Sequence, residues 1–183
     1  SFYEEMTNVP FIIAGPGIHP RQKPVEDLLT QPTIDLLPTL CELAGIPVPS
    51  SKPGISLAPF LKGEKQKRQH PYAASEWHSE YEVTVSPGRM IRSPRYKYTH
   101  YLEGNGEELY DMLKDKGERR NLAHDPKYSK ILAEHRALLD DYIRRTQDDY
   151  RSLKVEADKR WRSHAPGYPN HEGPCARDII NRK

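Results

Sequence analysis

Residues 9–14 read Val-Pro-Phe-Ile-Ile-Ala, and Gly15-Pro16-Gly17 follows directly. A short apolar run bounded by proline and glycine is typical of a strand buried on both faces of a sheet. Such a strand needs neighbours, and parallel neighbours require long crossover connections. The sequence offers no partner strand close by. We therefore expect residues 9–14 to be the last strand of a larger α/β sheet, in the back part of a longer protein.

A capped helix is predicted over residues 34–44. Asp35 is expected to cap its start, which places Pro38 in the first turn, where a missing N–H group is tolerated. Gly45 stands where glycine commonly ends helices, and a shorter helix is expected to end at Gly63. The predicted apolar face comprises Ile34, Leu37, Leu40, Cys41 and Ala44.

Composition narrows the class of protein. The formal net charge of +2 on 183 residues gives no reason to expect a nucleic acid partner. No apolar run approaches the length of a membrane span. The two cysteines, Cys41 in the predicted helix and Cys175 in a polar stretch, predict neither a metal knuckle nor a disulfide framework. With 17 prolines and 30% charged residues, we expect a loop-rich soluble chain.

The chain divides into four parts by composition and periodicity. Residues 1–63 hold the strand and helices above, and residues 64–70 form a charged linker. Residues 71–150 are predicted to be a compact α+β unit. Residues 151–183 form a basic tail with little periodicity.

The α+β unit is predicted to contain an antiparallel sheet. Residues 72–77 are one strand, residues 83–85 lie near a second, and residues 89–92 belong to that strand or to the next. Residues 96–101 alternate aromatic and polar side chains, as a half-buried strand does. A short edge strand is predicted over residues 108–111. Successive strands joined by tight turns indicate antiparallel pairing.

A strong helix follows the sheet. Asp125 is expected to cap it, and Pro126 takes its first position. Its apolar face should cover one face of the sheet, with His135 as a core histidine. That face comprises Tyr128, Ile131, Leu132, His135, Leu138, Leu139, Tyr142 and Ile143.

Short motifs of the second unit occur in a characteristic order. They are Met90-Ile91-Arg92, Tyr96-Lys97-Tyr98, Glu108-Leu109-Tyr110-Asp111 and Glu118-Arg119-Arg120-Asn121-Leu122. Their order and spacing, with the first sixty residues, resemble the late portion of the sulfatase family in the alkaline phosphatase superfamily, over about residues 1–150. The resemblance implies a fragment of the large alkaline phosphatase-like sheet domain, followed by a small subdomain of about four antiparallel strands and a long helix.

The same resemblance implies that the catalytic apparatus lies upstream. Sulfatases use a formylglycine made in a Cys/Ser-x-Pro-x-Arg motif, and they hold calcium with Asp and Asn oxygens. Cys41 is followed by Glu-Leu-Ala-Gly and does not match that motif. An active-site lysine or arginine of the family would fall about two positions ahead of Ser1. We therefore expect no catalytic or metal-binding residue here, and no turnover without the missing N-terminal catalytic part with its formylglycine and calcium.

Substrate recognition is the contribution expected from this chain. The candidate residues are Glu76, Trp77, His78, Arg89 and Arg92, because an aromatic face with charged hydrogen-bonding groups suits a saccharide. The resemblance implies that this edge leans over the active-site cleft. The spacing from Trp77 to Arg92 is similar to that of heparan N-sulfatases. The alternative is a strand whose Trp77 packs in the sheet while His78 and the acidic residues are solvated.

Three functions remain open. The first is the C-terminal part of a sulfatase acting on a sulfated saccharide. The second is the same part of a phosphodiester or phosphonate hydrolase, since a fold does not fix chemistry. The third is a non-catalytic carbohydrate-binding fragment. The resemblance also implies an exported protein, either periplasmic, extracellular or lysosomal. Glu4 is interpreted as a structural hydrogen-bond acceptor, because buried acids need partners.

Overall fold

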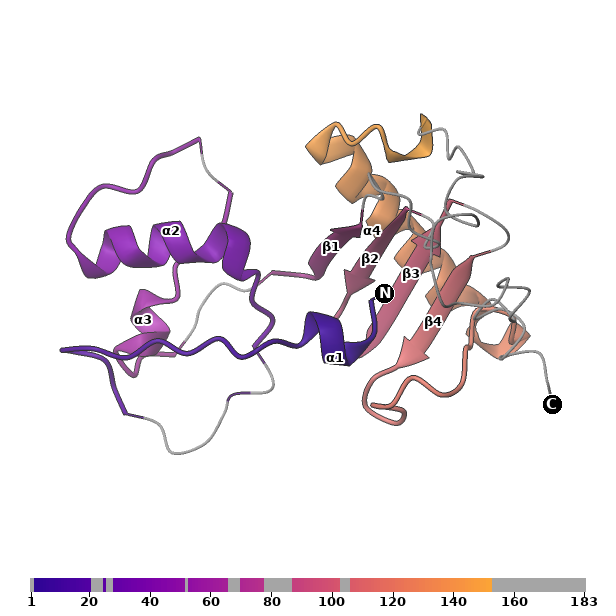
Figure 1. Ribbon diagram of the computed structural model, residues 1–183, viewed down its shortest axis with the longest axis horizontal. Coiled ribbons are helices and arrows are strands. Elements are labelled where there is room, and N and C mark those ends of the chain that lie inside the picture. The colour runs from indigo at the N-terminus through magenta and orange to yellow at the C-terminus, as the bar shows by residue number, and fades with distance from the viewer. Residues whose placement is uncertain are drawn as a thin grey trace, which may run out of the picture.

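The computed structural model describes residues 2–20, 25, 28–51, 53–65, 70–77, 87–102 and 106–152. Its centre is a four-stranded antiparallel sheet in the order β1-β2-β3-β4 (Figure 1). The strands are β1 Ala73–Trp77, β2 Gly88–Arg92, β3 Tyr96–Tyr101 and β4 Glu107–Asp111. Each strand pairs with its neighbour in sequence, which confirms the predicted antiparallel unit. Residues 83–85, predicted near a strand, lie outside the described residues.

The long helix α4, Ser129–Thr146, packs on one face of this sheet (Figure 1). The Asp125 carboxylate accepts a hydrogen bond of 3.1 Å from the Lys127 backbone N–H and so caps the 3₁₀ turn Pro126–Tyr128 that leads into α4. The predicted apolar face of the helix is confirmed. The core between helix and sheet comprises Tyr72, Ile91, Tyr98, Leu109, Leu122, Leu132 and Leu139.

His135 is a core histidine, as predicted. Its Nδ1 atom lies 2.8 Å from the Ile131 carbonyl oxygen, and its Nε2 atom lies 2.9 Å from the Ser93 hydroxyl. Burial lowers the pKa of His135 because the charged imidazolium loses its hydration. The Nε2 atom therefore joins α4 to the turn between β2 and β3, while the Nδ1 atom contacts a carbonyl of α4 itself.

The N-terminal segment covers part of the opposite face of the sheet. The short helix α1, Glu4–Thr7, crosses the sheet on the side away from α4 (Figure 1). Phe2 is buried there, with its ring centroid 5.9 Å from that of Tyr101. Lys97 and Thr99 of β3 are each only 1% exposed. The prediction of a half-buried β3 is therefore wrong, because residues far away in the sequence cover its polar face.

Residues 9–14 do not form the predicted buried strand. Their backbone pairs with no strand in the described part of the chain, and Val9 and Ile12 are 57% and 86% exposed. A strand exists only where a neighbour supplies its hydrogen bonds, and the described chain offers none, so the place of residues 9–14 in a larger sheet stays a prediction. The apolar pattern is real, but Val9 and Ile12 are exposed while Phe11 and Ile13 are half-buried.

The helix α2, Pro32–Leu43, begins earlier than predicted, and Asp35 is not its N-cap. Asp35 is fully buried within the first turns. Its carboxylate accepts hydrogen bonds from the backbone N–H groups of Gln31 at 2.7 Å and Ile55 at 2.8 Å, and lies 2.7 Å from His70 Nε2. A single buried carboxylate thus fixes α2 to two distant segments.

The predicted ends of both N-terminal helices are confirmed. Gly45 has φ +68°, and the Ile46 N–H donates to the Cys41 carbonyl at 2.8 Å, so the chain leaves α2 through a left-handed glycine. The second helix, α3, spans Ala58–Leu61, and Gly63 follows it with φ +89°.

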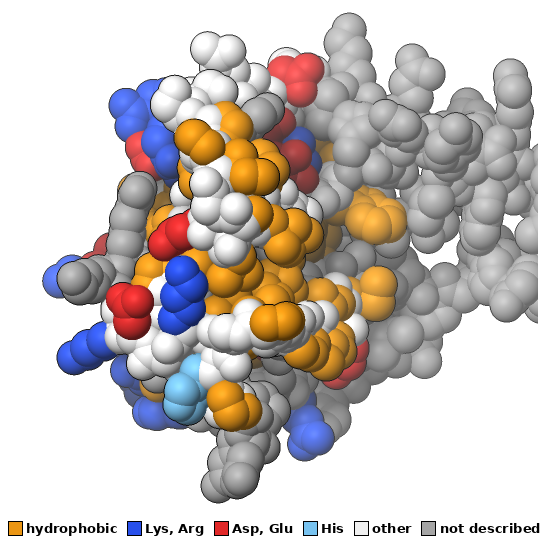
Figure 2. All heavy atoms as spheres, turned by 90° about the vertical axis from the view of Figure 1, so that its left-hand side faces the viewer, with side chains coloured by type: hydrophobic (Ala, Val, Ile, Leu, Met, Phe, Trp, Pro, Cys, Tyr) orange, Lys and Arg blue, Asp and Glu red, His pale blue; other side chains and the backbone are white. Residues whose placement is uncertain are grey.

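Hydrophobic side chains gather on the face of the molecule that includes α2 and residues 9–14. Figure 2 shows this face directly. The predicted apolar face of α2 therefore lies partly in solvent. None of the helices in the described ranges is long and apolar enough to cross a membrane. The exposed large hydrophobic residues include Val9, Ile12, Leu36, Leu37, Leu40, Ile46 and Val48.

Candidate functional site

The predicted substrate residues occupy two neighbouring strands but opposite faces of the sheet. Glu76 pairs in register with Arg89, while Arg92 pairs with Ala73 at the far end of the same ladder. Because side chains alternate along a strand, Glu76 and Arg89 share the face that packs on α4, and Trp77 and Arg92 belong to the other face. His78 lies outside the described residues. The structure thus brings together Glu76 and Arg89 but separates Arg92 from them.

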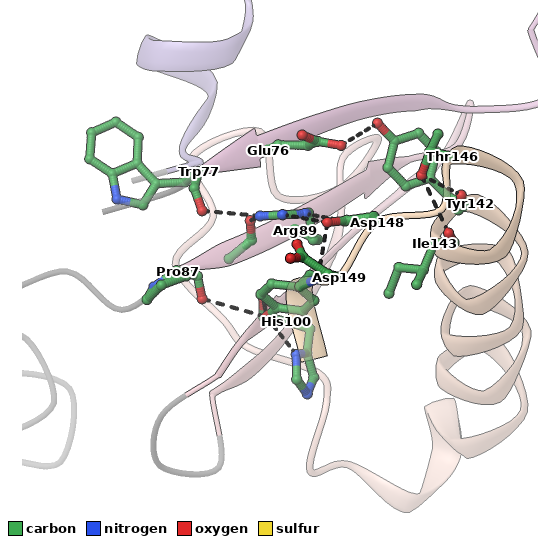
Figure 3. Close-up of polar contacts among 12 residues, drawn as sticks. Glu76, Trp77, Pro87, Arg89, His100, Tyr142, Ile143, Thr146, Asp148 and Asp149 are labelled. Atoms are coloured by element: carbon green, nitrogen blue, oxygen red, sulfur yellow. Dashed lines mark hydrogen bonds and ion pairs between the residues drawn. The ribbon is translucent and has the colours of Figure 1, made fainter. Parts of the chain in front are cut away.

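Arg89 is held from several directions within the protein (Figure 3). Its Nε and Nη2 atoms donate to the two carboxylate oxygens of Asp148, at 2.6 and 2.8 Å. Its Nη1 atom donates to the carbonyl oxygens of Trp77 at 3.1 Å and Gly88 at 2.8 Å. The guanidinium carbon lies 4.4 Å from the centroid of the Tyr150 ring, a cation–π distance. Arg89 is therefore an anchor for the strand ends.

The charge on Arg89 is maintained despite burial. The side chain is only 4% exposed, and loss of hydration alone would lower its pKa. The hydrogen bonds and negative charge of Asp148 outweigh this effect, so the pKa of Arg89 lies above its ordinary value. A buried bidentate pair of this kind has both charge and geometry fixed.

Glu76 and Trp77 end β1 in different environments. A Glu76 carboxylate oxygen accepts a hydrogen bond of 2.7 Å from the Tyr142 hydroxyl of α4, yet Glu76 itself is exposed. The indole of Trp77 points away from Glu76 and Arg89 (Figure 3). Its Nε1 atom is buried and has no hydrogen-bond partner in the described part of the chain. The end of β1 thus offers an exposed carboxylate and an indole, which suit sugar hydroxyls and ring faces.

Tyr150 completes the Arg89 cluster. It is fully buried, and its hydroxyl lies 2.7 Å from the carbonyl oxygen and 2.8 Å from the Nδ1 atom of His100. Burial lowers the pKa of His100. Sequence reasoning missed both Asp148 and Tyr150, because they lie about sixty residues from Arg89 and belong to no periodic pattern.

A second buried charge cluster lies on the opposite face of the sheet. Lys97 Nζ lies 2.8 Å from a carboxylate oxygen of Glu4 and 2.9 Å from one of Glu118, and it donates to the Phe2 carbonyl at 2.8 Å. The Glu4 backbone N–H donates to Glu118 at 2.7 Å. Glu4 is thus a structural acceptor, as predicted. This cluster attaches the N-terminal segment to the sheet.

Arg92 borders this second cluster and not the Arg89 cluster. Its Nε atom lies 3.9 Å from Glu4 Oε1, and burial lowers its pKa. Among the described residues, no group of three or more His, Cys, Asp and Glu side chains could hold a metal ion.

Comparison with known proteins shows the family. Residues 1–145 match the family described as "N-sulphoglucosamine sulphohydrolase, C-terminal". The chain is 76% identical over 183 residues to the "Delta 4,5-hexuronate-2-O-sulfatase" of Bacteroides thetaiotaomicron. The alignment includes all of this chain but only 38% of the length of that relative.

Solved structures agree. A structure described as a "2-O GAG sulfatase" is 77% identical, with a TM-score of 0.83 over 98% of this chain and 39% of its own. A structure in complex with its substrate D-glucosamine-2-N,6-O-disulfate is 26% identical, with a TM-score of 0.57 over 64% of this chain and 25% of its own. The four-stranded antiparallel sheet covered by a long helix, found here and in these neighbours, is the sulfatase C-terminal subdomain. The chain therefore belongs to the sulfatase family, and it corresponds to the C-terminal part of those enzymes.

Proposed function

We propose that this chain is the C-terminal part of an enzyme that hydrolyses sulfate esters of a saccharide, and that it contributes substrate recognition to that enzyme. The observation that carries the proposal is the 76% identity, over all 183 residues, to a hexuronate 2-O-sulfatase. Fold alone would not suffice, since one fold supports many reactions. Identity at this level along the whole chain favours the same substrate class.

The substrate proposed is an unsaturated hexuronate that carries a 2-O-sulfate at the end of a glycosaminoglycan fragment. The name of the same relative supports this choice. Two observations favour an N-sulfate instead. The spacing from Trp77 to Arg92 is similar to that of heparan N-sulfatases, and the matching family is described as an N-sulphoglucosamine sulphohydrolase. Whole-chain identity weighs more than a spacing, so the 2-O-sulfate is preferred.

The proposal divides labour between this chain and the rest of the enzyme. A formylglycine would supply the nucleophile and calcium would hold the sulfate, and both belong to the part that this chain does not span. The residues here do not fit either group: Cys41 lacks the required motif, and the described residues hold no metal cluster. The exposed apolar face of α2 and residues 9–14 supports the division, because large apolar patches commonly pack against another surface.

On this proposal, the end of β1 recognises the saccharide. The exposed Glu76 carboxylate accepts hydrogen bonds from sugar hydroxyls, Trp77 offers a ring face, and His78 donates or accepts beside them. Arg89 serves this surface by holding the strand ends, since its guanidinium already binds Asp148. Arg92 remains a proposed contact on the other face of the sheet. The enzyme is further proposed to be exported, which fractionation of the producing cells would test.

The first experiment assays the complete enzyme on unsaturated disaccharides that carry a single sulfate at the 2-O, N or 6-O position. We expect turnover of the 2-O-sulfated disaccharide, and none by the 183-residue chain alone. Turnover of only the N-sulfated compound would favour the N-sulfatase alternative. A preference for a phosphonate monoester would replace the sulfatase proposal. Glycan binding by the chain without any turnover of the complete enzyme would favour the carbohydrate-binding alternative.

The second experiment replaces His78 by alanine in the complete enzyme. We expect kcat/KM for the saccharide to fall by roughly ten- to a hundred-fold, because one or two substrate hydrogen bonds are worth about 1.5–3 kcal/mol. Hydrolysis of a small aryl sulfate should stay nearly unchanged, because that ester does not reach the end of β1. His124→Ala, at an exposed position in the described chain, is the control. Equal loss on both substrates would mean that His78 acts on the sulfate group or on folding.

A further inference from the structure

The segment that follows α4 turns back onto the sheet. Gln147 ends α4 in the left-handed region, with φ +55°, and the Asp148 N–H donates to the Ile143 carbonyl at 3.1 Å. This turn directs Asp148 toward β2 (Figure 3). It also places the Tyr150 hydroxyl against the His100 carbonyl of β3. We call residues 147–152 the return segment. A positive φ is energetically unfavourable for a residue other than glycine. We therefore expect the contacts of Asp148 and Tyr150 to stabilise this turn at Gln147.

The return segment binds the place where β1 ends and β2 begins. Through Arg89 it reaches the carbonyl oxygens of Trp77 and Gly88, which are the last residue of β1 and the first residue of β2. The Tyr150 hydroxyl lies 3.5 Å from the Pro87 carbonyl and 2.7 Å from that of His100. One buried Arg–Asp pair and one buried tyrosine thus fix the ends of three strands together.

The same end of α4 also holds the exposed carboxylate of Glu76. The Tyr142 hydroxyl donates to Glu76 from the last turns of α4, at 2.7 Å. The contacts of the return segment described above lie at the Trp77–Gly88 end of the β1–β2 ladder, and Ala73 pairs with Arg92 at the opposite end. Loosening the return segment should therefore affect one end of the ladder and leave the other intact.

We infer that Asp148 and Tyr150 are positioning residues for substrate recognition, acting through Arg89 on the end of β1. The inference rests on the proposed function, in which that strand end recognises the saccharide. Asp148 fixes the orientation of the guanidinium, because its two oxygens bind two different nitrogens. Tyr150 prevents the guanidinium from moving away from the strand ends, because its ring lies against it. Neither side chain needs to touch the substrate.

The test replaces Asp148 by asparagine in the complete enzyme. This variant keeps the size of the side chain but removes its charge, and so weakens the bidentate pair. Asp140→Asn is the matched control. Asp140 also forms an ion pair with the return segment, through Arg151, but both of these side chains are more than half exposed. An exposed pair contributes little to structure. Tyr150→Phe is the milder second variant, since it removes only the hydroxyl.

Two readouts are measured on each variant. In Asp148→Asn, KM for the sulfated saccharide should rise about tenfold with kcat nearly constant, and hydrolysis of a small aryl sulfate should not change. Amide hydrogen exchange at Trp77, Gly88 and Arg89 should accelerate about tenfold, while exchange at Ala73 stays the same. Tyr150→Phe should shift both readouts in the same direction by about threefold, and Asp140→Asn should shift neither.

Two results on the Asp148→Asn variant would overturn the inference. Equal loss on the saccharide and the aryl sulfate would assign Asp148 to general folding. Faster exchange without a change in KM would show that the strand end plays no part in recognition. If the unmodified enzyme hydrolysed no sulfate ester, the proposed function would fail. Calorimetric binding of the sulfated disaccharide would then decide the inference, which requires about tenfold weaker binding by Asp148→Asn.

Discussion

Replacing Lys97 by methionine should destabilise the chain strongly. Lys97 is 1% exposed, and its ammonium group lies within 3 Å of a Glu4 oxygen, a Glu118 oxygen and the Phe2 carbonyl. Methionine keeps most of the volume but removes the charge. Glu118, whose side chain is 2% exposed, then stays buried with its nearest cation gone.

The magnitude follows from these contacts. Removing one partner of a buried ion pair costs about 3–5 kcal/mol, because the remaining charge is left uncompensated. Two features reduce the cost here: Glu4 is a quarter exposed and can be hydrated, and Arg92 lies 3.9 Å from Glu4. We therefore expect the free energy of unfolding to fall by about 3 kcal/mol. For a chain of this length, that corresponds to a loss of roughly 6–12 °C in Tm.

Urea unfolding followed by circular dichroism at 222 nm measures this loss. Lys130→Met, at an exposed position of α4, is the control and should change stability by less than about 0.5 kcal/mol. The double variant Lys97→Met with Glu118→Gln should recover about 1–2 kcal/mol, because it removes the uncompensated charge but keeps an acceptor for the Glu4 N–H. A loss below about 1 kcal/mol in Lys97→Met would refute this account of the cluster.

Two further predictions concern single contacts. Gly88→Ala would place a methyl group 2.7 Å from the Phe2 ring and 2.8 Å from the Tyr101 ring. Thermal unfolding should show that the free energy of unfolding falls by about 1–3 kcal/mol. Gly15→Ala is the control and should change it very little, because a methyl group there meets no atom within 4 Å. Hydrogen bonds from Arg136 lower the pKa of Glu107 to about 2; burial opposes this shift, and a hydrogen bond from Tyr98 adds to it. The carboxylate is favoured in the folded state, so this stabilisation is complete above about pH 4.5 and is lost as the pH falls toward 2. In Arg136→Met, urea unfolding should show about 1 kcal/mol less stability at pH 7 and little difference near pH 2. The loss at pH 7 is small because Arg136 is half exposed and water screens the ion pair. An equal loss at both pH values would contradict the link between this ion pair and the pH dependence of stability.

Periodic patterns predicted the second unit of the fold well. Alternation in residues 96–101 identified β3, and the spacing from Tyr128 to Ile143 identified the apolar face of α4. These elements pack against each other within about fifty residues of chain, so each pattern reflects the environment that the element actually has. The pattern in residues 9–14 is just as clear, yet Ile12 is almost fully exposed. A pattern shows what a segment needs, and the described chain contains no strand that meets this need.

The candidate site was predicted only in part, for a different physical reason. The sequence pointed to Glu76 and Arg89 because of their chemistry, and the register pairs them. It did not reveal that Asp148 already binds Arg89. The opposite face of Arg92 does follow from alternation along a strand, because Arg89 and Arg92 are three residues apart. Contacts between side chains some sixty residues apart follow from how the chain returns after α4, and here that return depends on one left-handed residue, Gln147. No period or motif in the sequence encodes such a turn.

The two buried charge clusters explain how a four-stranded sheet can serve as a link between other parts of a protein. Lys97 holds the segment that enters the sheet region, and Arg89 holds the segment that leaves α4, on opposite faces of the same strands. Each uses a cation anchored in the sheet to bind a carboxylate on a segment that also buries an aromatic side chain, Phe2 in one case and Tyr150 in the other. A buried ion pair adds little net stability compared with apolar packing, but it tolerates only one geometry. Such pairs are therefore suited to fixing where a segment lies, which is what substrate recognition at the end of β1 would require.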